Sequence, residues 1–396
     1  MPYVEGRIVH DADSHIMELP DSFDPYLETR YLQRFHELPD VRARRSYLEH
    51  MDKARALQAD ADFRAAVDDT VMLRKNHEAH GSFLAEDRPR ALDLLGFASQ
   101  LVFTTFGLSN FGLDQTSDHE FCYAVADAQN RMMTDFCATD RRLLAAAYIP
   151  IEDFDQAIAC ATRAIDMGAK ALMIPSRPAK THAHSHVGLD PLWATAQEAG
   201  LPVLFHVGGQ EKMDPVYLEN GLPPVPDFHG GDDNFTSVSY MPIPTSVMQT
   251  VAVMIFDGVF DRFPNLKFGA IELGASWMPG WMRSMDSAAH AFTRNEERLQ
   301  NLSAKPSEIV RRQFRAAPYP HEDAGWIIRN AGEEVAMFSS DYPHVEGGRN
   351  PLKRFNECLE GLSDEAVDGF FAANFIDMMG EGLAEDLRRP AHLLAA

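Results

Sequence analysis

Carboxylate and imidazole side chains recur in this chain where short apolar segments end. The segment RIVHDADSH, residues 7–15, closes with Asp13 and His15, which one residue separates. In a β-strand such a pair faces one side together, and a carboxylate beside a neutral imidazole suits a divalent transition metal. Because this pattern also arises by chance, its weight depends on further partners. Three later residues also end apolar segments: His206, Glu272 and Asp341.

Two of these partners lie in sequence contexts that favour a buried site. His206 ends the apolar run LPVLFH and precedes two glycines, which let backbone or substrate approach closely; a core histidine is the alternative. Asp341 ends the run FSS, and burying its charge is costly unless a cation or hydrogen bonds offset the cost. His344 lies three residues further on and either folds back toward the same pocket or caps a surface turn.

The remaining candidates have more than one interpretation. Glu272 follows the run LKFGAI and is either a metal ligand, a general base or the partner of Arg283 in a salt bridge. Loop histidines could contact metal or substrate, although most loop histidines are simply solvated. These are His182, His184, His186, His229 and His321.

The spacing of apolar segments predicts the fold that must position these residues. Most of the segments are followed by helix-like sequence, and several are continuously apolar, as in parallel strands buried on both faces. Eight strands alternating with helices form an α/β protein of the (β/α)8 TIM-barrel type. The predicted strands are Ile8–Asp13, Gln100–Thr105, Leu143–Ile149, Ala169–Ile174, Pro202–His206, Leu266–Ile271, Phe314–Ala317 and Val335–Ser340.

Two connections are too long to be simple loops. Residues 16–99 are polar and contain helical stretches, which predicts a helical cap inserted after strand one. Residues 207–241 are rich in Gly, Pro and Asp, which predicts a loop on the active face, where loops build the site of such barrels. With no linker or repeat, residues 1–396 are predicted to form a single domain.

The composition of the chain limits the kinds of molecule that it can bind. The chain has 396 residues, 45% of them hydrophobic, and a formal net charge of −23. This acidity argues against nucleic acid or an anionic membrane as partner, and favours a small-molecule substrate. The four cysteines show no paired spacing, and neither a signal peptide nor a run of about 18 apolar residues is evident. We therefore expect a cytoplasmic protein.

Together these residues make the chain resemble the amidohydrolase superfamily, and within it the branch of aminocarboxymuconate-semialdehyde decarboxylase and related carboxylate decarboxylases. The likeness spans the barrel and is weak only in the insertion after strand one. Four stretches carry it: DADSH (11–15) with Glu18, FH (205–206), IFDGVFDRFPNLKF (255–268) and SSDYPHVEG (339–347).

The resemblance implies a barrel of the metal-dependent hydrolase type and a divalent ion, zinc or manganese, held by Asp13, His15, His206 and Asp341. It implies hydrolysis or non-oxidative decarboxylation of a small cyclic or aromatic carboxylic or carbonyl substrate. A metal-bound water or a metal-bound substrate carboxylate would carry the reaction. Asp341 would act as base or proton shuttle, Glu272 as second base, and a homodimer is expected.

One departure opens an alternative. Where the decarboxylases have a catalytic histidine after strand six, this chain has Glu272. Glu272 could bridge two ions, with His344 and either His229 or His321 completing a second site. The chain would then be a dinuclear non-haem iron or manganese–iron oxygenase. A metal-stabilised binding protein without catalysis is the third hypothesis.

Overall fold

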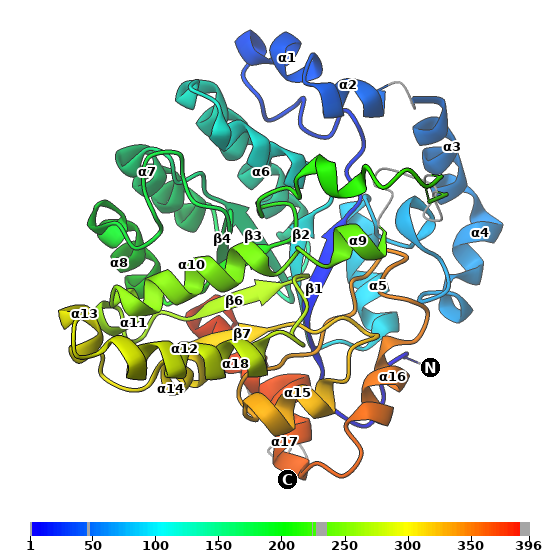
Figure 1. The fold of residues 1–396 in the computed structure, drawn as a ribbon. Helices are drawn as coiled ribbons and strands as arrows, with labels where there is room; N and C mark the ends of the chain where they lie inside the picture. The colour runs from blue at the N-terminus through cyan, green and yellow to red at the C-terminus, as the bar shows by residue number, and fades with distance from the viewer. Residues whose placement is uncertain (1, 46–47, 224, 227–235, 389–396) are drawn as a thin grey trace.

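The computed structural model describes residues 2–45, 48–223, 225–226 and 236–388. Its centre is a sheet of seven parallel strands, each paired with the next in sequence (Figure 1). This architecture agrees with the predicted (β/α)8 barrel. The strands are β1 (His10–Ile16), β2 (Ser99–Thr104), β3 (Leu143–Tyr148), β4 (Ala171–Ile174), β5 (Val203–His206), β6 (Phe268–Ile271) and β7 (Phe314–Ala316).

The predicted eighth strand, Val335–Ser340, forms single bridges rather than a regular strand, yet it closes the barrel. On one side the amide of Ala316 donates to the carbonyl of Val335 at 2.8 Å. On the other side the amide of Ala12 donates to the carbonyl of Phe338 at 3.0 Å. Backbone hydrogen bonds therefore join β7 to β1 through this segment.

Helices surround the strands, as the alternating pattern predicts. Several begin at an aspartate whose carboxylate accepts a backbone N–H of the first turn, which stabilises the helix start: Asp118, Asp153 and Asp323. The helices of this layer are α6 (His119–Cys137), α7 (Phe154–Asp166), α8 (Asp190–Glu198), α10 (Thr245–Phe256), α11 (Val259–Arg262), α12 (Met278–Phe292), α13 (Glu297–Gln300), α14 (Pro306–Gln313), α15 (Ala324–Ala331) and α16 (Pro351–Cys358).

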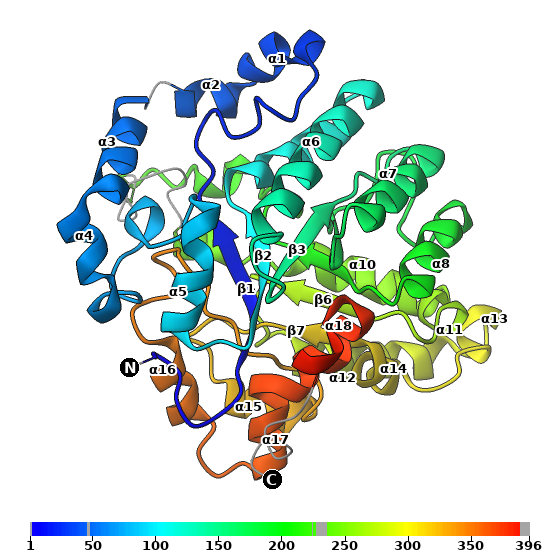
Figure 2. The ribbon, with the colours of Figure 1, turned by 180° about the vertical axis from the view of Figure 1, so that it is seen from behind.

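The C-terminal helices cover the end of the barrel at which β1 begins. They are α17 (Asp364–Asp368) and α18 (Asn374–Met379), joined by a π-helical turn. Seen from behind, α18 lies across this end (Figure 2). The ring of Phe375 stacks on His10 with centroids 5.2 Å apart.

The segment between β1 and β2 contains the predicted helices. They are α1 (Thr29–His36), α2 (Pro39–Arg45), α3 (Leu48–Ala59), α4 (Ala61–Ala65) and α5 (Arg88–Leu95). The buried guanidinium of Arg88 donates to the carbonyl of His15 at 2.9 Å, and the hydroxyl of Tyr342 donates to the carbonyl of His80 at 2.7 Å. These bonds tie the cap to β1 and to the chain that follows the eighth barrel segment.

The long segment after β5 is described only in part. It contains the short helix α9 (Ser237–Tyr240) next to α10. Together, residues 237–256 are long and apolar enough to cross a membrane by length and composition, which the sequence reading did not anticipate. Pro242 and Pro244 separate the two helices, and α10 buries Val247, Val251 and Met254 within the protein. One face of α10 thus packs against the barrel, and 39% of the apolar window in this stretch is buried.

Candidate metal centre

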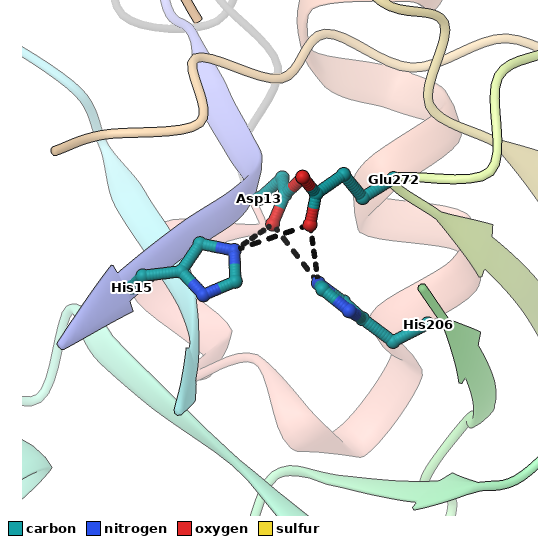
Figure 3. A group of neighbouring side chains, drawn as sticks. All are labelled: Asp13, His15, His206 and Glu272. Carbon is teal, nitrogen blue, oxygen red and sulfur yellow. Dashed lines mark ion pairs between the residues drawn. The ribbon is translucent and has the colours of Figure 1, made fainter. Parts of the chain in front are cut away.

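Four side chains from three strands converge inside the barrel (Figure 3). Asp13 and His15 lie within β1, which extends to Ile16, His206 ends β5, and Glu272 follows β6. One oxygen or nitrogen atom from each lies within 4.8 Å of the other three. Nε2 of His15 is 3.1 Å from Asp13 Oδ1 and 3.7 Å from Glu272 Oε2, and Nε2 of His206 is 3.5 Å from each of these oxygens.

These atoms lack the partners that buried polar atoms normally have. Within the described residues, Asp13 Oδ1 and the Nε2 atoms of His15 and His206 are buried without a hydrogen-bond partner. Leaving such groups unpaired is costly. Since all three face one space together with a carboxylate oxygen of Glu272, the donor set fits a divalent cation bound by mixed nitrogen and oxygen ligands.

Backbone carbonyls orient both imidazoles. Nδ1 of His15 lies 2.9 Å from the carbonyl oxygen of Thr104, and Nδ1 of His206 lies 3.1 Å from that of Val207. A carbonyl only accepts, so Nδ1 carries the proton and Nε2 keeps its lone pair for a metal. Phe103 packs against His206, with ring centroids 4.5 Å apart.

Burial and neighbouring charges shift the pKa of three residues in this group. Burial, followed by the nearby charge of His344, lowers the pKa of His15 to about 4, so the ring is neutral near pH 7. Burial alone would raise the pKa of Asp13, but the interactions with His15 and His206 lower it below the usual value. Burial, together with the charges of Asp341 and Asp13, raises the pKa of Glu272 well above its usual value.

Two acidic residues of the site have a left-handed backbone. Glu272 has φ of 54° and Asp341 has φ of 52°, a backbone region that residues other than glycine rarely occupy. Such strain persists only where the surrounding structure imposes it, and it concentrates at functional sites. At both strand ends it turns a carboxylate toward the barrel axis instead of continuing the strand.

Asp341 and His344 form a second group beside the first. Asp341 Oδ1 lies 3.7 Å from Nε2 of His15 and 2.8 Å from Nδ1 of His344. Nε2 of His344 lies 2.8 Å from the hydroxyl oxygen of Thr105. Burial favours neutral imidazole, but Asp341 outweighs it and raises the pKa of His344 above its usual value. Both ring nitrogens of His344 are thus engaged by the protein.

The loop histidines lie elsewhere. His184 is buried and its Nε2 lies 2.8 Å from the carbonyl of Pro175. His182 and His186 pack on the ring of Phe154. His321 lies 3.2 Å from the hydroxyl of Tyr240, and His229 falls outside the described residues.

Two further carboxylates near the site, Asp11 and Glu18, have structural roles. Asp11 accepts the amide and the hydroxyl of Ser340 at 2.8 and 2.7 Å, and the side-chain amide of Gln100 at 2.9 Å. Glu18 accepts the backbone N–H groups of Thr105 and Gly107 at 2.9 and 3.0 Å. Asp11 thereby fastens the barrel seam, and Glu18 fixes the loop after β2.

The tryptophan-rich stretch at the start of α12 packs inward. Met278, Trp281 and Met282 are buried, and the indole of Trp281 donates to the carbonyl of Met248 at 3.0 Å. This stretch therefore belongs to the barrel wall.

Solved structures share this fold. An amidohydrolase from Mycobacterium avium subsp. paratuberculosis matches with a TM-score of 0.67 at 23% identity, covering 95% of this chain and 100% of its own. A variant of 5-carboxyvanillate decarboxylase from Novosphingobium aromaticivorans, with bound manganese and 3-methoxy-4-hydroxy-5-nitrobenzoic acid, matches with a TM-score of 0.61 at 16% identity, covering 94% and 96%.

A third solved structure belongs to the same group. Dihydroxybenzoic acid decarboxylase from Polaromonas, with bound manganese and the inhibitor 2-nitroresorcinol, matches with a TM-score of 0.61 at 14% identity, covering 97% of this chain and 100% of its own. No curated protein sequence matches the chain. The amidohydrolase family model matches residues 34–376, and the chain therefore belongs to the amidohydrolase family.

Proposed function

We propose that the protein is a metal-dependent carboxy-lyase that removes the carboxylate of a small aromatic acid without oxidation. The observation that carries the proposal is the convergence of unpartnered donor atoms from Asp13, His15 and His206 with the carboxylate of Glu272. Decarboxylation is preferred to hydrolysis because two neighbours of the same fold are decarboxylases of aromatic acids.

Asp13, His15, His206 and Glu272 would hold the ion. Manganese is the preferred candidate, since both decarboxylase neighbours contain it and since carboxylate oxygen makes up half of the donor set. When bound, the ion supplies positive charge that orients and polarises the oxygen atoms of the substrate.

The remaining acidic group handles the proton. In a decarboxylation the bond between the ring carbon and the carboxylate breaks, CO₂ leaves, and the ring carbon takes up a proton. Asp341 lies beside the donor set, 3.7 Å from Nε2 of His15, and would hold this proton at its carboxylate. His344, 2.8 Å from Asp341, and its partner Thr105 fix the direction of that carboxylate.

The geometry favours one ion over the dinuclear oxygenase alternative. His15, Asp341 and His344 form a second group of potential ligands beside the first, but Asp341 and Thr105 already bind the two ring nitrogens of His344, and His321 lies against Tyr240. We therefore do not propose oxygenase chemistry. The predicted cytoplasmic location and homodimeric state stay predictions.

The test is CO₂ release from a panel of hydroxylated benzoic acids by manganese-loaded protein. We expect turnover by wild type, loss of turnover in Asp341→Asn with manganese content unchanged, and wild-type turnover in Asp155→Asn, which alters an exposed aspartate of α7. Full turnover by Asp341→Asn, or the absence of manganese from loaded wild type, would refute the proposal.

A further inference from the structure

Lys75 is a buried cation of the cap. The Nζ atom of Lys75 is buried and has no hydrogen-bond partner in the described part of the chain. Lys75 lies immediately before Asn76, whose backbone N–H donates to the carbonyl of Pro343 at 2.8 Å. The lysine is therefore held against the loop that follows Asp341.

Other cations of the cap are satisfied by the protein. Both terminal nitrogens of Arg64 bind the carboxylate of Asp87, at 2.6 and 2.5 Å. One nitrogen of Arg55 binds both oxygens of Asp21, at 2.7 and 2.8 Å. A buried ammonium without such a partner is costly, which indicates that Lys75 meets its partner only when another molecule is bound.

The backbone bond between Asn76 and Pro343 places Lys75 beside the loop that follows Asp341, at the barrel seam. Burial lowers its pKa to about 8, while Asp341 and then Glu346 act against that shift. Neither carboxylate forms an ion pair with Lys75 in the described residues. The ammonium of Lys75 therefore lies in the electrostatic field of Asp341, as the metal centre does. None of its N–H groups donates a hydrogen bond to a described residue.

We propose that Lys75 binds the carboxylate of the substrate, an inference that rests on the proposed function and deepens it. The acidic side chains Asp13, Glu272 and Asp341 offset the positive charge of a bound ion and so weaken its attraction for an anionic substrate. An ammonium supplied by the cap adds positive charge at one edge and strengthens the preference of the site for acids over neutral analogues. The cap is then part of the substrate-binding site.

The experiment compares acids with their amides on the full-length, manganese-loaded protein. Calorimetric titration measures binding of benzoate, 2,6-dihydroxybenzoate and 4-hydroxy-3-methoxy-5-nitrobenzoate, each against its carboxamide. The variants are Lys75→Met, Lys75→Arg and, as control, Lys53→Met, which alters an exposed lysine of α3 in the same cap. Manganese content and melting temperature are measured on each protein.

In wild type and Lys53→Met we expect at least one acid to bind about tenfold or more tightly than its amide, the size of a charged hydrogen bond. Lys75→Met should reduce this preference about tenfold with manganese retained, and Lys75→Arg should restore part of it. An unchanged preference in Lys75→Met, or none in wild type, overturns the inference. Preference without CO₂ release would instead count against the proposed reaction and leave the role of Lys75 intact.

Discussion

The imidazole of His344 donates from Nε2 to the hydroxyl oxygen of Thr105, 2.8 Å away. The direction of this bond is fixed because the hydroxyl proton of Thr105 already goes to the carbonyl of Ile16 at 2.7 Å. The other ring nitrogen faces the carboxylate of Asp341, which only accepts. The loop after β2 thereby sets the orientation of a group at the end of the eighth barrel segment.

This relationship predicts the effect of Thr105→Val. The variant leaves the Nε2 proton of His344 without an acceptor. We expect kcat to fall by about 10- to 100-fold, the usual effect of removing a residue that hydrogen-bonds to a side chain of the site. Thr105→Ser keeps the oxygen and should retain most of the activity. Steady-state kinetics with manganese analysis checks this, and equal activity in both variants would show that His344 needs no acceptor.

Removing a ligand should remove the metal. His206→Ala eliminates an Nε2 atom that faces Asp13 and Glu272, and we expect manganese affinity to drop by at least about 100-fold. The control is His184→Ala, another buried histidine beyond a strand end, whose Nε2 binds a backbone carbonyl. It should lose stability by about 1–3 kcal/mol but bind manganese normally in elemental analysis. If His184→Ala loses metal equally, general misfolding explains both results.

Chelation should destabilise the protein. Without a cation the carboxylates of Asp13, Glu272 and Asp341 repel one another, and a ligand present at one hundred times its Kd contributes about 2.7 kcal/mol to stability. We expect the melting temperature to fall on treatment with EDTA and to recover when manganese is added. An unchanged melting temperature after verified loss of metal would argue against this coupling.

A carboxyl group away from the centre should make stability depend on pH. Burial raises the pKa of Asp114 from 3.8 to about 6, so between these values the folded state binds more protons than the unfolded state. Stability then falls as the pH rises through this window, by up to about 3 kcal/mol. Asp114→Asn should remove this part of the slope. Urea midpoints of both proteins at about pH 4 and pH 7 measure it, and parallel slopes would contradict the assignment.

Much of the fold and the family could be predicted from the sequence, and the model and the comparisons confirm both, together with the general class of a metal-dependent hydrolase or carboxy-lyase. Continuous apolar runs such as VLFH, which forms β5, define parallel strands with little ambiguity. The sequence predicted Asp13, His15, His206 and Asp341 as the ligands of one ion, whereas the structure groups the first three with Glu272 and puts Asp341 beside them. Whether they bind metal stays a prediction.

Other features depend on tertiary structure and leave no local pattern. The left-handed backbone at Glu272 and Asp341 is imposed by packing, and no glycine marks it in the sequence. The orientation of His344 depends on Thr105, which lies in a separate loop. Lys75 belongs to a polar segment that resembles any solvated surface, yet its ammonium is buried where the next residue, Asn76, binds the carbonyl of Pro343.

The seam joins β1, the first strand of the barrel, to the eighth and last segment. At this seam the amide of Asp341 donates to the carbonyl of Asp13 at 2.9 Å. During synthesis, most of the barrel is made before the residues that close it. The metal-binding pocket can thus reach its final charge and shape only in the last stage of folding, because contacts of such sequence separation form slowly. A nascent or truncated chain would expose Asp13 and His15 without their partners, so tight metal uptake would report that the whole polypeptide has folded.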